Sequence, residues 1–175
     1  MEKKTTINQE PSFIQSINIS KDWCKDWEDN LLSDEVLADR IKELIKSKRG
    51  TRGFFAYALS DSECGLLDKL PSSIIFTLRE SGEHIVEITV KNLFMSSAQI
   101  VNHQKAKNFE YAERSHNISE RCINLLKELD TKLVTKKINK MLSEIDNMGN
   151  SFDNAVKYSA EQKSFIRKKV NEIAQ

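Results

Sequence analysis

The residues of this chain best suited to bind an anion lie in the segment 47–55, which reads SKRGTRGFF. Lys48, Arg49 and Arg52 supply positive charge, and a guanidinium can hold a phosphate or carboxylate through two parallel hydrogen bonds. Backbone N–H groups at the start of the following FFAYA stretch would add further donors. The glycine spacing matches neither the Walker A loop nor G-x-G-x-x-G, so the segment predicts a simple anion site with Arg49 and Arg52 as binding residues.

The same segment also has the composition of a helix C-terminus. Lys46, Lys48 and Arg49 would then lie in a last turn, where cations complement the helix dipole. Gly50 would close that helix in the left-handed conformation, and Gly53 would let the chain turn into the next apolar segment. We therefore expect a helix end whose exposed cations are available for binding.

The histidines offer one further candidate binding residue. His84, His103 and His116 lack a metal-ligand spacing such as H-x-x-x-H, so no metal site is predicted. His103 ends a long apolar stretch and can lie in a crevice, where its titratable imidazole would be useful. A structural or surface role for His103 is the alternative. The sequence predicts no catalytic residue and no cofactor.

The three cysteines, Cys24, Cys64 and Cys122, are far apart in the sequence and form no C-x-x-C pair. This pattern is typical of thiols that serve as small core residues in a reducing compartment. A nucleophilic pair of Cys64 or Cys122 with His103 has no local signature. We expect a cytoplasmic protein, since residues 1–15 also lack the apolar core of a signal peptide.

The overall composition excludes several classes of protein. The 27 basic and 26 acidic residues give a net charge of +1, so a general affinity for nucleic acid is not expected. No run of about 18 apolar residues is present, so no insertion into a membrane is expected. Only five glycines and two prolines occur in 175 residues, and a sandwich or barrel would need more turn signals. The composition therefore favours helices.

The periodicity predicts an all-α protein, with residues 20–175 as a single compact helical domain. Ser20 is expected to cap a helix that begins at Lys21. Residues 1–19 are predicted to be a mobile N-terminal tail, in which the stretch 12–20 could add a short strand. At the other end, Ser159 and Gln162 form a capping box for a terminal helix that buries Phe165 or Ile166.

Residues 73–91 allow two interpretations. The alternation of Val86, Ile88 and Val90 with polar residues predicts a β-hairpin, which would make the fold α+β. The rival interpretation is two helices, the first ended by Gly82. The apolar face of the second would continue from Val86 through Val101, well beyond the length of an ordinary strand. We favour the helices.

Three stretches, GTRGFFAYALSD, VKNLFMSSAQIVNHQ and AVKYSAEQKSFI, resemble a family of small cyanobacterial and plastid proteins that has no assigned activity. The resemblance covers residues 50 to about 166. It implies a helix for the second stretch and the cytosol of a photosynthetic bacterium. It carries over no catalytic residue.

The expected function is non-enzymatic binding of a partner protein, or an assembly role, through a helical face. This expectation rests on the lack of a complete catalytic motif, the balanced charge and the surplus of apolar residues. The alternative is a small-molecule or phosphate-binding protein, an enzyme included, with a site near Arg52 and His103.

Overall fold

The computed structural model describes residues 10–147 and 157–174, and these ranges contain helices and no strand. The predicted all-α fold is confirmed. The β-hairpin alternative is wrong, because residues 73–91 lie in two helices joined at Gly82, whose φ is 81°. The chain divides into two compact units, residues 1–81 and 82–175. The prediction of one domain for residues 20–175 stays a prediction, and each unit is described by itself.

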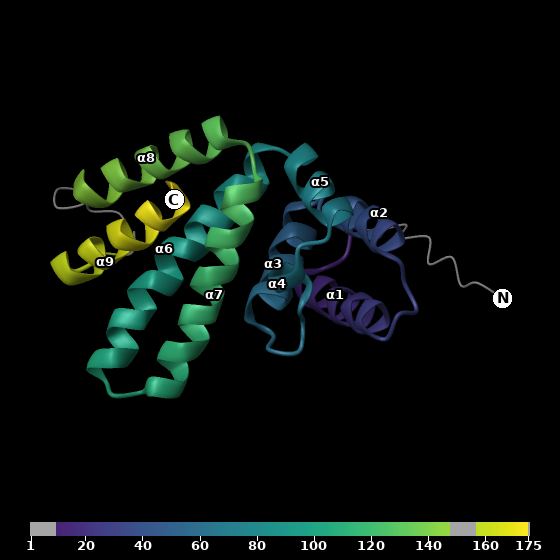
Figure 1. The fold of residues 1–175 in the computed structure, drawn as a ribbon, viewed down its shortest axis with the longest axis horizontal. Coiled ribbons are helices and arrows are strands. Elements are labelled where there is room, and N and C mark those ends of the chain that lie inside the picture. Colours follow the sequence, from purple (N-terminus) through teal and green to yellow (C-terminus); the bar gives the residue numbers. More distant parts are fainter. Residues whose placement is uncertain (1–9, 148–156, 175) are drawn as a thin grey trace. The chain divides into compact units, whose positions relative to one another are not determined.

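The described part of unit 1, residues 10–81, contains five helices, which Figure 1 shows. Their bounds are α1 (Phe13–Glu28), α2 (Asp34–Leu44), α3 (Lys48–Ser60), α4 (Leu66–Lys69) and α5 (Ser72–Glu80). Helix α1 packs along α3, and α2 packs against α5. The side chains of Phe54 and Phe55 meet edge to face at 5.3 Å between ring centroids in the core of this unit.

Helix α1 begins earlier than the sequence suggested. Ser12 caps it, and its hydroxyl and the Gln15 side chain each accept the other's backbone N–H in a capping box. Ser20, the predicted cap, lies inside the helix and donates its hydroxyl to the Ser16 carbonyl. The predicted tail is therefore wrong for residues 13–19, as is the suggested short strand. Residues 1–9 of the tail lie outside the described ranges.

Helix α3 begins where a helix was expected to end. The Ser47 hydroxyl accepts the Gly50 N–H at 2.9 Å, which caps the new helix and satisfies one of its free donors. Gly50 has no positive φ. A β-carbon at Gly50 would lie 1.9 Å from the Leu44 carbonyl oxygen. The left-handed closure predicted for Gly50 is therefore wrong, and this glycine permits the close approach of two helices instead.

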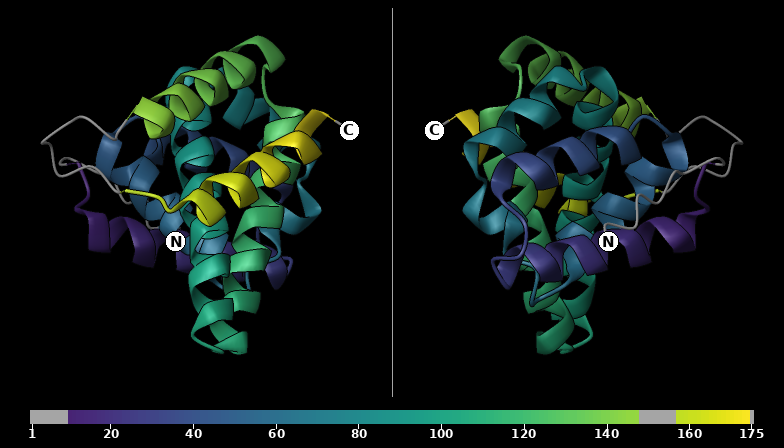
Figure 2. Two further views of the ribbon diagram at one scale, coloured as in Figure 1. Left: turned by 90° about the vertical axis from the view of Figure 1, so that its left-hand side faces the viewer. Right: turned by 90° about the vertical axis from the view of Figure 1, so that its right-hand side faces the viewer.

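Unit 2 is built on a long antiparallel pair of helices, α6 (Glu83–Lys105) and α7 (Phe109–Glu128). The two lie side by side in Figures 1 and 2. Helices α8 (Thr131–Asn147) and α9 (Ala160–Asn171) pack on α6, and the short η2 (Glu172–Ala174) follows α9. The predicted apolar face of α6 is confirmed: Val86, Val90, Leu93, Phe94, Ser97 and Val101 are all buried.

Polar contacts fix α9 in place. The predicted capping box of Ser159 and Gln162 is confirmed. The Gln162 amide nitrogen also donates to the Ala98 carbonyl at 3.3 Å and to the Asn102 side-chain oxygen at 2.9 Å, so the same side chain starts α9 and fastens it to α6. Of the two predicted apolar residues, Ile166 is the one that α9 buries fully, whereas Phe165 is half-buried.

Candidate functional site

The cations of segment 47–55 occupy the first turns of α3 rather than a last turn. Lys48 and Arg49 are exposed there, beside backbone N–H groups that have no acceptor within the helix. The predicted helix end at these cations is wrong, because α2 already ends at Leu44 and Ser47 is a strong cap. The position of Arg49 is still compatible with an anion, since the N-terminus of a helix attracts negative charge.

Arg52 lies one turn further along α3 and contacts α1. Its guanidinium carbon is 5.4 Å from the centre of the half-buried Phe13 ring, which is a cation–π geometry. The side chain is exposed. In this structure Arg52 therefore covers the beginning of α1, a role that the sequence did not indicate.

His103 lies in the last turn of α6 and is half-buried. Its ring centroid is 5.5 Å from that of Tyr111 on α7, and the guanidinium carbon of Arg114 lies 5.4 Å from the centre of the same Tyr111 ring. His103 belongs to unit 2, whereas Arg49 and Arg52 belong to unit 1. A site that combines the three residues stays a prediction.

Unit 2 has a groove of about 600 Å³ between α6, α7, α9 and η2. Two aromatic side chains, Phe109 of α7 and Phe165 of α9, line it over an apolar floor, and Phe109 is 69% exposed. Its lining residues are Ile100, Gln104, Phe109, Ala112, Glu113, His116, Phe165, Lys168, Lys169 and Glu172. The groove thus combines exposed aromatic surface with charged side chains at its edges.

Lys169 forms two ion pairs at the charged end of the groove. It is only 6% exposed, and its Nζ donates to Glu120 of α7 at 2.7 Å and to Glu172 of η2 at 3.2 Å. Burial alone lowers the pKa of Lys169, but the hydrogen bonds that it donates to these two carboxylates outweigh burial and raise the pKa overall. The ammonium therefore stays charged and joins α9 to α7.

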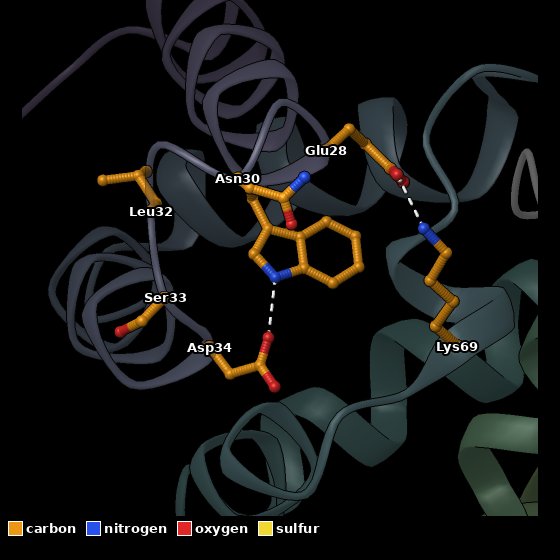
Figure 3. A pocket seen from close by; sticks show the side chains of 7 residues that line it. Glu28, Asn30, Leu32, Ser33, Asp34 and Lys69 are labelled. Atoms are coloured by element: carbon orange, nitrogen blue, oxygen red, sulfur yellow. Dashed lines mark hydrogen bonds and ion pairs between the residues drawn. The ribbon is translucent and has the colours of Figure 1, made fainter.

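Unit 1 has a smaller polar pocket, of about 380 Å³, between the end of α1, the start of α2 and Lys69 (Figure 3). The Trp27 indole N–H donates to Asp34 at 2.7 Å. Lys69 pairs with Glu28 at 2.6 Å and lies 4.8 Å from the Trp27 ring. Glu28 also accepts the Gly65 N–H at 3.0 Å. Because these polar groups already pair with one another, the pocket presents little free hydrogen-bonding capacity to a ligand.

Two thiols meet inside unit 1. Cys24 on α1 and Cys64, which follows α3, are each 1% exposed. The N–H of Gly65, next to Cys64, donates at 3.0 Å to the carboxylate of Glu28, one helical turn after Cys24. The hydrogen bond to Cys64, burial, and the nearby carboxylates of Glu28 and Asp61 raise the pKa of Cys24. Burial, together with the same thiols and Asp61, raises the pKa of Tyr57. All three cysteines are buried and none forms a disulfide, which confirms their expected role as core residues.

Sequence reasoning missed both the groove and the thiol pair. The pair had no signal, because nothing in the spacing of Cys24 and Cys64 shows that α1 meets the segment after α3. The groove had a weak sequence signal: Phe109 lies in the mostly polar stretch KNFEYAER, where no apolar helical stripe requires a large apolar side chain.

Residues 10–147 and 157–174 contain neither a cluster of potential metal ligands nor a membrane-spanning helix. No three histidine, cysteine, aspartate or glutamate side chains gather there closely enough to hold a metal ion. None of the helices in these ranges combines the length and apolar character needed to cross a membrane.

Over its described residues the chain is an all-α protein with a surface groove in unit 2. A family model described as "Uncharacterised conserved protein UCP020893" matches residues 12–173, and the chain belongs to this family. The match supports the resemblance to an uncharacterised family. Neither the curated proteins nor the solved structures include a match to this chain.

Proposed function

We propose that this protein is a non-enzymatic binding or assembly protein, and that the groove of unit 2 receives an amphipathic helix from a partner protein. The exposed Phe109 is the observation that carries the proposal. A ring that is 69% exposed beside a second aromatic and an apolar floor is typical of a binding surface rather than of a solvated helix face.

The floor and walls of the groove suit the apolar face of a helix. Ile100 of α6 and Ala112 of α7 are almost fully buried and make up the floor, while Phe109 and Phe165 are the more exposed aromatic residues of the lining. An amphipathic helix that enters such a groove places anchors at i, i+3, i+4 and i+7 between the walls. Burying the two aromatic rings would supply the favourable free energy of binding.

The charges at the edges suggest an orientation for the partner. Glu113 on α7 and Lys168 on α9 are both exposed, and within the described residues neither has an ion-pair partner. A partner helix with a basic residue towards α7 and an acidic residue towards α9 would complement both charges. Such pairs at an edge influence specificity and association rate more than affinity.

Photo-crosslinking tests the proposal. A photoreactive phenylalanine derivative replaces Phe109 in one variant and Met95, an exposed α6 residue outside the groove's lining, in a matched control. The proposal expects one protein from an extract of the native host to crosslink through position 109 and not 95, with the attachment mapped to an amphipathic helix. The combined charge reversal Glu113→Lys with Lys168→Glu should weaken that crosslink. Equal crosslinking from both positions would contradict the proposal, and a crosslink to a second copy of this chain would replace the partner by a homodimer.

A second candidate is binding of phosphate or another small anion, with Arg49, Arg52 and His103 as the predicted residues. The observation in its favour is the exposed pair Lys48 and Arg49 in the first turn of a 13-residue helix. Thermal melts with phosphate, against chloride at equal ionic strength, test it. The parent should gain stability from phosphate, and Arg49→Ala and Arg52→Ala should lose that gain. An equal response in parent and variants would remove the anion site.

Two further proposals concern the origin of the protein and its cellular compartment. The resemblance to cyanobacterial and plastid proteins supports an origin in a photosynthetic lineage, and the buried free thiols support a reducing compartment such as the cytoplasm. Fractionation of the native host, followed by detection of the protein with an antibody, tests the compartment. Recovery from an extracellular or periplasmic fraction would contradict it.

A further inference from the structure

We propose that Cys24 and Cys64 form a reversible intramolecular disulfide, which gives unit 1 a dithiol–disulfide modification site that reacts with a hydroperoxide. The inference is independent of the groove, which lies in unit 2. Its basis is position: Cys24 lies on α1 one turn before Glu28, whose carboxylate accepts the N–H of Gly65, next to Cys64, at 3.0 Å. Both thiols are only 1% exposed. Cys122, a buried thiol in unit 2, provides a natural control.

The reaction is a two-electron oxidation that balances with hydrogen peroxide. The Cys64 thiolate attacks one peroxide oxygen, the O–O bond breaks, and hydroxide leaves with the proton lost by the thiol as the first water. The Cys24 sulfur then attacks the sulfur of the resulting sulfenic acid. Its hydroxyl leaves with the Cys24 proton as the second water, and the S–S bond remains.

Cys64 is the thiol that can be reached first. It lies in the short segment between α3 and α4, where side-chain carboxylates, rather than helical carbonyl groups, accept several backbone N–H hydrogen bonds. Asp61 accepts the N–H groups of Glu63 and Cys64, and Glu28 accepts that of Gly65. Opening the segment breaks these few bonds and leaves the helices intact. Cys24, within α1, has no comparable freedom.

The closed state protects the pair from reaction. The hydrogen bond to Cys64 and burial raise the pKa of Cys24, so little thiolate is present while the segment is closed. Oxidation must therefore proceed through the opened segment, and the expected rate is slow compared with that of an exposed thiol. Once formed, the bond would join α1 to the segment before α4 and close a loop of about 40 residues.

The test uses the full chain, first reduced and then treated with hydrogen peroxide under native conditions. Remaining thiols are alkylated and the peptides are mapped by mass spectrometry. The expected product has lost two hydrogen atoms and links the peptides of Cys24 and Cys64, while Cys122 remains alkylated. Dithiothreitol should restore all three thiols. The oxidised chain should melt higher, by on the order of 10 °C.

Substitutions test the order of the two steps. In Cys24→Ser, a sulfenic acid should persist on Cys64 and react with dimedone, whereas Cys64→Ser should give no such adduct on Cys24 in the same time. Cys122→Ser should leave the disulfide unchanged. The proposal is overturned if the link forms only in urea, if Cys122 reacts as fast as Cys64, or if peroxide leaves all three thiols free. The mapping of the unsubstituted chain decides the matter even if a variant fails to fold.

Discussion

Gly53 of α3 lies so close to Ser16 of α1 that a β-carbon built on the glycine would be 2.3 Å from the Ser16 β-carbon. The Phe13 carbonyl oxygen would be 2.9 Å away. This close approach fixes how α1 and α3 pack, and these two helices share the most extensive interface of unit 1. The glycines of segment 47–55 therefore serve helix packing in this structure.

The first prediction concerns this contact. Gly53→Ala should lower the free energy of unfolding by about 1–3 kcal/mol, because the added methyl overpacks the interface. An exposed Gly→Ala change inside a helix would instead gain about 1 kcal/mol from helix propensity. Chemical denaturation measures the difference. The double variant Ser16→Gly with Gly53→Ala should recover part of the loss. If Gly53→Ala were as stable as the parent, α1 and α3 could move apart at this contact without a cost in free energy.

The second prediction concerns the core of unit 2. Leu93 and Phe94 are fully buried in α6, so Leu93→Ala and Phe94→Ala should each cost about 2–5 kcal/mol of unfolding free energy. The neighbouring Met95 is 55% exposed, and Met95→Ala should change the stability by less than about 0.5 kcal/mol. Denaturant titrations compare the three variants. Losses of similar size at positions 94 and 95 would contradict the orientation of α6.

The sequence predicted α6 well because its apolar residues keep one helical period from Val86 to Val101, and burial of that face requires a helix. It predicted the start of α9 because a capping box is a local signal. The start of α1 was predicted wrongly although Ser12 and Gln15 form an equally good capping box. The weak alternation of the residues after Ser12 suggested a strand instead.

Segment 47–55 was misinterpreted because local signals conflicted there. Cations followed by a glycine are typical of a helix end, whereas Ser47 is typical of a helix start. Tertiary packing favours the helix start over the helix end. Gly50 and Gly53 lie inside α3, where the absence of a β-carbon allows the Leu44 carbonyl and Ser16 to approach closely. The thiol pair and the groove depend on contacts between distant segments, which periodicity and capping do not encode.

The third prediction concerns pH. Glu87 of α6 bonds Lys91 and also pairs with Lys137 of α8 at 3.4 Å. The hydrogen bond with Lys91 lowers the pKa of Glu87 despite the opposing effect of burial. A carboxyl with a lowered pKa in the folded state stabilises the protein above its ordinary pKa, and this contribution is lost as the pH falls through the lowered value.

Glu87→Gln should therefore lower stability at pH 7 by less than about 1 kcal/mol, since the carboxylate is partly exposed. At a pH below the lowered pKa the parent and the variant should be equally stable, because Glu87 is then protonated in the folded and unfolded chains alike. Denaturation at both pH values measures this. A variant that is equally destabilised at both would indicate a packing effect instead. Lys137→Gln is the matched variant that removes only the α6–α8 pair.

The last prediction compares two adjacent lysines of α9. Lys169 is 6% exposed and bonded to Glu120 and Glu172, whereas Lys168 is exposed and has no such pair among the described residues. Lys169→Met keeps most of the side-chain volume but leaves the two carboxylates without their cation. Because those carboxylates retain some access to water, we expect a loss of about 1–2 kcal/mol rather than the 3–5 kcal/mol of a fully buried charge.

Lys168→Met is the matched control, and it should alter the stability by less than about 0.5 kcal/mol. Chemical denaturation of both variants provides the comparison, and high salt should change the result for Lys169→Met little, because a nearly buried pair is weakly screened. If the two variants were equally stable, Lys169 would not be the residue that joins α9 to α7. The packing of α9 would then depend on the buried Ile166 and on the Gln162 hydrogen bonds to α6, and Ile166→Ala should cost about 2–5 kcal/mol.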